Sequence, residues 1–160
     1  MSWLFPDARS ALSREQTQGQ TQGQSLELHR HGETVAVEHT ERTRVAWADT
    51  DAGGRIHFTN AFRWAEQAET ALRRKLGLLD DWGSYPRRQV EAEFRQVLRF
   101  EDEIDVRICP ERLGETSITW RFEITRDGEP CVDGRMVVVH VDDDGRATPL
   151  TDRERAALSG

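Results

Sequence analysis

The sequence predicts an α+β domain in which one long helix packs against a single antiparallel sheet. Between Thr59 and Leu79, apolar residues recur at intervals of three and four, which is typical of a helix with one broad apolar face. From Val90 to Val141, apolar and polar residues alternate instead, which is typical of strands with one buried face. A sheet of this kind must cover its apolar face, and the helix is the element available to do so.

Length and charge limit the possibilities further. The chain has 160 residues, which suits one domain with a workable core. We expect a flexible arm over residues 1–32, whose Gln- and Gly-rich repeat has little to bury, a folded domain over 33–150 and a tail over 151–160. The 22 basic and 29 acidic residues give a net charge of -7, which argues against a nucleic-acid partner. Because no apolar run reaches the roughly 20 residues that span a bilayer, we expect no membrane contact and a cytoplasmic location.

The first strand and the helix have recognisable limits. The apolar residues Val35, Val37, Val45 and Trp47 share one parity and predict a strand with one buried face that ends at Trp47. The helix that follows has either Thr59 or Asn60 as a suitable N-cap and Gly77 as a plausible end. Its predicted buried positions are Ala61, Trp64, Ala65, Ala68, Ala71, Leu72 and Leu76.

Four strands are predicted after the helix. They lie within residues 90–100, 104–108, 116–124 and 131–141, and the turn at Asp127 and Gly128 links the last two. Short connections predict that these four strands form an antiparallel meander in chain order. With the first strand they make a sheet of five.

The acidic turn at residues 49–54 separates the first strand from the helix. A carboxylate at this place faces a helix N-terminus, whose unpaired amides can hold a developing oxyanion. Asp51 could activate water or attack a carbonyl itself, although turn aspartates commonly bind only their own backbone. Asp49 fits that structural role better. Gly53 and Gly54 favour the catalytic role for Asp51, because glycine lets the backbone approach a ligand closely.

Further polar residues are open to two interpretations. His57, beside the helix N-terminus, could orient water or substrate, or it could be a packed, hydrogen-bonded residue at a strand end. Basic residues around the second predicted strand suit a ligand that carries phosphate groups, but each could equally pair with a neighbouring acid. These are Arg87, Arg88, Arg95 and Arg99. The five histidines and two cysteines show no metal-ligand spacing, so we expect neither a metal nor a cofactor.

The element order, with residues 46–54 before the helix, resembles the hotdog-fold thioesterases of the 4-hydroxybenzoyl-CoA thioesterase type. The resemblance runs from about Val45 to about Val141 and includes the stretch from Ile56 to Asn60. It implies a hotdog fold, in which a five-stranded antiparallel sheet wraps around one long helix. It also implies homodimers or homotetramers whose active sites lie at the subunit interface. Arg55 departs from the family, in which an apolar residue is common at that position.

The same resemblance implies a reaction and its residues. Asp51 matches the family's catalytic carboxylate, as general base or nucleophile, and Phe58 matches the residue whose amide polarises the thioester carbonyl. The substrate would be a thioester of coenzyme A (CoA) or of acyl carrier protein. We expect the remaining substrate contacts at Gly54, Asn60, Trp64, Arg87 and Arg88.

Three alternative functions remain open. A hotdog enzyme could add an amino-acid amine to an enoyl thioester before hydrolysis, with His57 and Asp51 moving the protons. A hotdog dehydratase or hydratase is a second alternative, although the residues at the helix start do not fit its usual pattern. In a related hotdog branch, a glutamate of the long helix is the catalytic acid, and Glu66 is the candidate for that role in this chain. That branch has a His-Gly-Gly motif at the helix entry, and this chain lacks the motif. The third alternative is an acyl-CoA-sensing module without catalysis.

Overall fold

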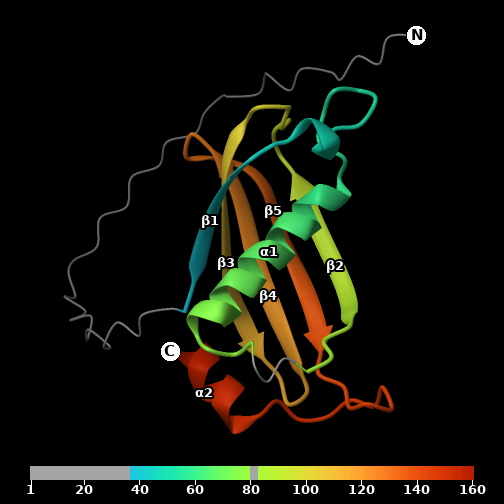
Figure 1. The fold of residues 1–160 in the computed structure, drawn as a ribbon, viewed down its shortest axis with the longest axis vertical. Coiled ribbons are helices and arrows are strands. Elements are labelled where there is room, and N and C mark those ends of the chain that lie inside the picture. The colour runs from blue at the N-terminus through green and yellow to red at the C-terminus, as the bar shows by residue number, and fades with distance from the viewer. Residues whose placement is uncertain (1–36, 80–82) are drawn as a thin grey trace, which may run out of the picture. The chain divides into compact units, whose positions relative to one another are not determined.

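The structure, a computed structural model, describes residues 37–79 and 83–160. The predicted arm and Val35 lie outside these residues. Within them the chain forms five strands crossed by one long helix, with a short helix near the C-terminus (Figure 1). No helix in this part of the chain is long and apolar enough to cross a bilayer. The strands are β1 (His39–Arg44), β2 (Arg87–Phe94), β3 (Glu103–Leu113), β4 (Ser117–Arg126) and β5 (Glu129–Val139); the helices are α1 (Thr59–Lys75) and α2 (Asp152–Ser159), with a 3-10 turn η1 at Trp47–Asp49.

The sheet is antiparallel with the order β1-β3-β4-β5-β2. Strands β3, β4 and β5 form the predicted meander, and Asp127 and Gly128 both have positive φ, 54° and 81°, as a tight hairpin turn requires. The prediction of a four-strand meander was wrong, because β2 pairs with β5 at the far edge. The eight residues 95–102 can reach roughly 25 Å when extended, more than the roughly 14 Å across three strand spacings. A short link therefore need not join neighbours.

Helix α1 covers one face of the sheet (Figure 1). Its predicted apolar face is confirmed at the positions that are buried in the structure, and small side chains there let the helix approach the sheet closely. These are Ala61, Trp64, Ala65, Ala68 and Leu72. The ring of Phe62 meets that of Phe122 on β4 edge to face, with centroids 6.0 Å apart. The predicted helix end is also confirmed, since Gly77 takes a φ of 68°.

The predicted N-cap was wrong. The helix begins at Thr59, with Phe58 in the capping position and no side-chain cap. The side chains of the two predicted caps point elsewhere: the Asn60 amide donates to the Asp49 carbonyl at 2.7 Å, and the Thr59 hydroxyl lies 2.7 Å from His57 Nδ1.

Several predicted buried residues are exposed. Strand β1 ends at Arg44, and Trp47 lies in η1 with 77% of its surface exposed. Val90 and Phe94 on β2 are 46% and 45% exposed, and Phe100 is also exposed. Because β2 is an edge strand, one helix does not cover its apolar side chains. An apolar rim is left open along this edge.

Helix α2 forms where a tail was expected. Thr151 and Glu154 make a capping box, a spacing that is visible in the sequence. Glu154 is nearly buried, with its Oε1 3.4 Å from Arg73 Nη1 and accepting a hydrogen bond from the Tyr85 hydroxyl. Arg73 also binds Glu69 at 3.0 Å. The C-terminal helix is thus fastened to the end of α1 through buried charges.

Candidate active site

The acidic turn is a closed loop that projects the Asp51 side chain into solvent. The Asp51 amide donates to the Arg55 carbonyl at 2.7 Å, and Gly54, with a φ of 69°, donates to the Asp51 carbonyl at 3.0 Å. Asp51 Oδ1 accepts a hydrogen bond from the Gly53 amide at 2.7 Å. Oδ2 has no hydrogen bond within the described part of the chain. One carboxylate oxygen is therefore oriented by the backbone and the other is open to water or substrate.

Asp49 has the structural role that was predicted for it. Its side chain is 7% exposed, accepts a hydrogen bond from the Ala46 amide at 2.9 Å and forms an ion pair with Arg63. Its carbonyl accepts from the His57 amide at 2.8 Å and from Asn60 Nδ2. Asp49 thus joins the end of the first strand to the start of α1. Arg63 was not predicted as Asp49's partner, because a polar residue in the first turns of a helix is its only signal in the sequence.

His57 is hydrogen-bonded at the helix start but its ring is not packed. Nδ1 lies 2.7 Å from the Thr59 hydroxyl oxygen and 3.4 Å from the Thr59 amide nitrogen. The ring is exposed and leans on Phe58, with centroids 4.8 Å apart. A catalytic role for His57 stays a prediction.

The amide of Phe58 is an open donor at the start of α1. No hydrogen bond from it is present within residues 37–79 and 83–160, whereas the amides of Asn60 and Ala61 already bind the carbonyls of His57 and Phe58. The positive end of a helix dipole lies at this amide. An open amide and an open carboxylate thus lie on one short segment, a combination suited to attack on a polarised carbonyl.

The predicted substrate contacts do not all gather at the turn. Gly54 is in the turn and Asn60 borders it, but Trp64 is buried beneath the sheet. Arg87 and Arg88 begin β2, whereas the turn meets the chain beyond the other end of that strand, where the Ile56 amide donates to the Leu98 carbonyl at 3.0 Å. The substrate-binding roles of these five residues stay predictions.

The four arginines of the predicted basic cluster do not gather at one place either. Arg87 binds Glu66 and Glu69 on α1 at 2.9 and 2.8 Å, and Arg95 binds Glu93 and Asp133. Arg88 and Arg99 are exposed, and their side chains have no hydrogen bond or ion pair within the described part of the chain. The two unpaired arginines lie at opposite ends of β2.

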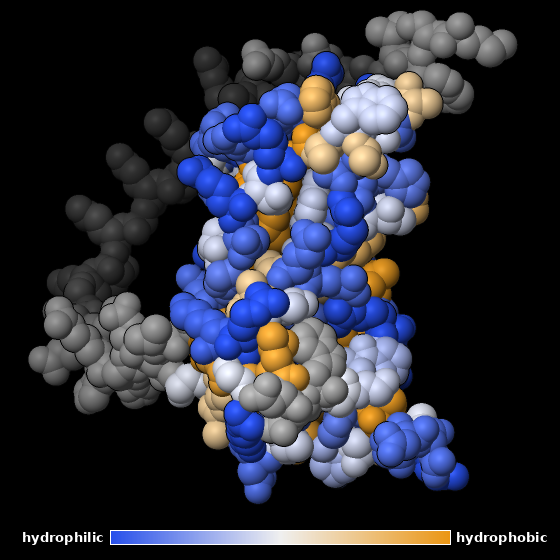
Figure 2. Space-filling view, viewed as in Figure 1, coloured by the Kyte–Doolittle hydropathy of each residue, from blue (hydrophilic) through white to orange (hydrophobic). Residues whose placement is uncertain are grey.

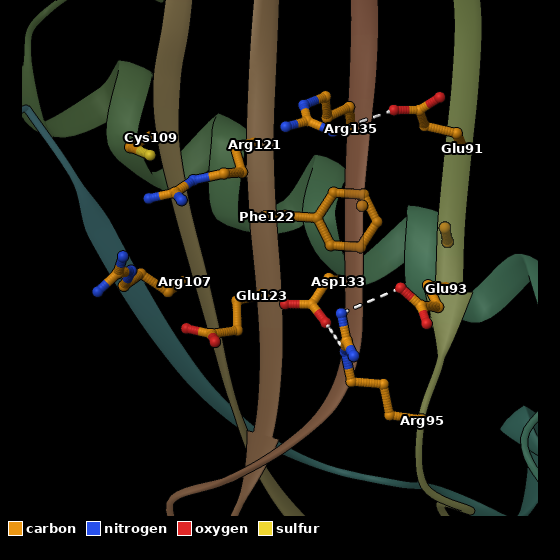
Figure 3. Close-up of a pocket in the computed structure, with 12 residues that line it drawn as sticks. Glu91, Glu93, Arg95, Arg107, Cys109, Arg121, Phe122, Glu123, Asp133 and Arg135 are labelled. Atoms are coloured by element: carbon orange, nitrogen blue, oxygen red, sulfur yellow. Dashed lines mark hydrogen bonds and ion pairs between the residues drawn. The ribbon is translucent and has the colours of Figure 1, made fainter. Parts of the chain in front are cut away.

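A groove of about 510 Å³ lies on the sheet face opposite α1, and it does not include the acidic turn (Figure 3). Ion pairs span it: Arg135 binds Glu111 at 2.7 Å and Glu91 at 3.4 Å, and Arg95 reaches Asp133. Such exposed ion pairs are typical of a charged, solvent-exposed sheet surface.

The surroundings of the turn are apolar instead. Figure 2 shows pale and orange atoms gathered at the upper end of the molecule, over the start of α1. The exposed large apolar residues of the described chain are Trp47, Phe58, Val90, Phe94, Val97 and Phe100. Exposed apolar residues that gather in this way are typical of interaction or ligand-binding surfaces.

Comparison with known proteins identifies the family and the fold of the chain. Residues 45–158 match the family model described as the thioesterase-like superfamily. A 1,4-dihydroxy-2-naphthoyl-CoA hydrolase of Prochlorococcus marinus (strain NATL1A) is 29% identical over 129 residues, covering 72% of this chain and 81% of the relative. A predicted thioesterase from Bacillus stearothermophilus has a structure similar to this one at 26% identity, with a TM-score of 0.69, covering 76% of this chain and 93% of the other. The fold is also that of a 1,4-dihydroxy-2-naphthoyl-CoA thioesterase from Synechocystis, at 16% identity and a TM-score of 0.69, covering 76% and 95% of the two chains. The chain therefore has the hotdog fold and belongs to the thioesterase-like superfamily.

Proposed function

We propose that this protein hydrolyses acyl-CoA thioesters, and that it works in the manner of the 4-hydroxybenzoyl-CoA thioesterase type. One observation carries the proposal: Asp51 presents an open carboxylate oxygen on the same rigid segment as the unpaired Phe58 amide. The family of the chain supports it.

In the proposed reaction, the Phe58 amide binds the thioester oxygen as negative charge develops there. Asp51 either removes a proton from water, whose oxygen then bonds to the carbonyl carbon, or bonds to that carbon itself to give a mixed anhydride that water later opens. In both routes the carbon–sulfur bond breaks, and CoA leaves as the thiolate and takes up a proton. His57, exposed beside this amide, is in a suitable place to orient the water or substrate.

The working unit is proposed to be a homodimer or a homotetramer. Val90 and Phe94 lie on the edge strand β2, which has no further strand beside it in one described chain. A second copy paired along β2 would cover these side chains and would supply a wall for the substrate beside the turn. This assembly would cover the exposed turn.

For the acyl group, aromatic thioesters are the first candidates, because the relatives are named for 1,4-dihydroxy-2-naphthoyl-CoA. Thioesters of acyl carrier protein are the second. A cytoplasmic location stays a prediction.

A thiol-release assay over aromatic, short-chain, long-chain and enoyl CoA thioesters tests the proposal. We expect turnover of at least one class, and loss of that turnover in Asp51→Asn. Repeating the enoyl arm with a free amino acid tests the amine-addition alternative, since an adduct seen by mass spectrometry would assign that extra step. No release from any thioester by the folded wild type would refute the proposed function.

A further inference from the structure

Two exposed arginines border the acidic turn on neighbouring segments. The Ile56 amide donates to the Leu98 carbonyl at 3.0 Å, so the chain after the turn runs beside the chain after β2. Ile56 and Leu98 both point into the core. Arg55 and Arg99 are both exposed, and each is next to one of these two paired residues in the chain, so the two arginines flank the contact between the segments.

Neither guanidinium is neutralised. The side chains of Arg55 and Arg99 make no hydrogen bond or ion pair within residues 37–79 and 83–160. Most other arginines of the described chain bind a carboxylate; Arg44, Arg63 and Arg126 are examples close to the turn.

Three acids on the neighbouring segments are already paired, and Asp51 is the acid left open. Glu101 binds Arg44 at 2.9 Å, Asp102 binds Arg126 at 2.8 Å, and Asp49 pairs with Arg63. Arg55 and Arg99 therefore leave local positive charge beside Asp51, in a chain whose net charge is -7. Positive charge at an open site attracts anionic ligands and is satisfied by phosphate oxygens.

We propose that Arg55 and Arg99 bind phosphate groups of the thiol carrier and thereby position its thioester at Asp51. The inference rests on the proposed function in taking this turn as the thioester site. It replaces the predicted basic cluster, because Arg87 is held by two acids of α1 and Arg88 lies at the other end of β2. CoA carries a 3′-phosphate and a diphosphate, whereas the prosthetic group of a carrier protein has a single phosphodiester. The two sources of phosphate can therefore be told apart.

Calorimetric titration of the full chain with four ligands separates them: CoA, dephospho-CoA, 4′-phosphopantetheine and pantetheine. In the wild type we expect affinity to fall from CoA to pantetheine. The double variant Arg55→Ala/Arg99→Ala should bind CoA at least about tenfold more weakly, as expected for lost charge-assisted hydrogen bonds, and should no longer distinguish CoA from pantetheine. High ionic strength should weaken CoA binding by the wild type more than by the double variant.

Arg112→Ala is the matched control. This arginine is exposed and unpaired within the described chain, but it lies at the far end of β3. Its replacement should not change CoA affinity. A loss confined to CoA and dephospho-CoA identifies the nucleotide phosphates as the ligand, and an equal loss for 4′-phosphopantetheine identifies the phosphate shared with carrier protein.

The proposal is overturned if the wild type binds CoA no better than pantetheine, if the double variant keeps the preference, or if Arg112→Ala loses it equally. These results do not depend on turnover. Arginine-dependent CoA binding without thioester hydrolysis would refute the proposed function alone, and hydrolysis without any phosphate preference would refute this inference alone.

Discussion

The amide of His57 donates to the carbonyl of Asp49 at 2.8 Å and closes the loop that carries Asp51. The two aspartates of the turn therefore have different tasks. Asp49 is buried and holds the helix start against the strand end, while Asp51 projects from the loop between them. Loss of a carboxylate should affect mainly stability at one position and mainly chemistry at the other.

Asp51→Asn should lower turnover by about two orders of magnitude or more, because the amide is neither basic nor nucleophilic. It keeps the oxygen that accepts from the Gly53 amide, so the melting temperature should stay close to that of the wild type. Asp49→Asn is the matched control and should cost about 1–2 kcal/mol of stability through its weakened bond to Arg63. Thiol release and thermal melting on both variants check this. Near-normal turnover in folded Asp51→Asn would remove Asp51 from the mechanism and leave Glu66 to be tested.

His57→Ala should lower turnover by roughly tenfold or more and change the melting temperature little. The ring is exposed, so its removal leaves no cavity, and only its contacts with Thr59 and Phe58 are lost. Both quantities should be measured on one preparation. If turnover per folded enzyme is unchanged, His57 has no part in the reaction, and Asp51 and the Phe58 amide remain as the reacting groups.

The buried charges at α2 predict a loss of stability in acid. Burial opposes ionisation of Glu154, but hydrogen bonds from Tyr85 and Thr151 and the charge of Arg73 outweigh it and hold the pKa of Glu154 below its ordinary value of 4.5. Because the pKa of Glu154 is lower in the folded state, its ionised carboxylate stabilises the fold at pH values above the ordinary pKa. This contribution is lost as the pH falls below about 5 and through the folded pKa.

Glu154→Gln should therefore lower stability at pH 7 by about 1–3 kcal/mol, and its melting temperature should fall less steeply between pH 6 and pH 3. Glu129→Gln, at an exposed position on β5, is the control and should follow the wild type. Melting curves over that pH range test the prediction. Parallel curves for Glu154→Gln and wild type would show that Glu154 does not carry the acid sensitivity.

Local patterns predicted the parts of the fold that depend on neighbours in sequence. The period of α1, its end at Gly77 and the turn at Asp127 follow from side-chain size and backbone freedom, which the sequence displays. The position of β2 in the sheet depends on which edge strand it pairs with. The alternation of apolar and polar residues does not distinguish the two edges, because a strand has the same pattern at either one. For that reason the meander was predicted one strand too long.

The same distinction between local and distant contacts applies to the candidate site. Asp51, His57 and Phe58 share one segment, so their proximity follows from the chain itself. The pairing of Arg87 with Glu66 and Glu69, and the backbone hydrogen bond between Ile56 and Leu98, depend on contacts between distant segments. No spacing in the sequence records such contacts. The exposure of Val90 and Phe94 likewise follows from the edge position of β2.

That exposure leads to a prediction about assembly. The wild type should be a dimer or tetramer in light scattering at micromolar concentration, because a second copy along β2 would cover Val90 and Phe94. Val90→Asp/Phe94→Asp places two charges in the proposed interface and should weaken association by roughly tenfold or more. Thr40→Asp adds a charge to β1, the opposite edge of the sheet, and should leave the assembly intact. Circular dichroism must show that each variant is folded. A monomeric wild type would contradict the prediction, and dissociation by Thr40→Asp alone would move the interface to β1.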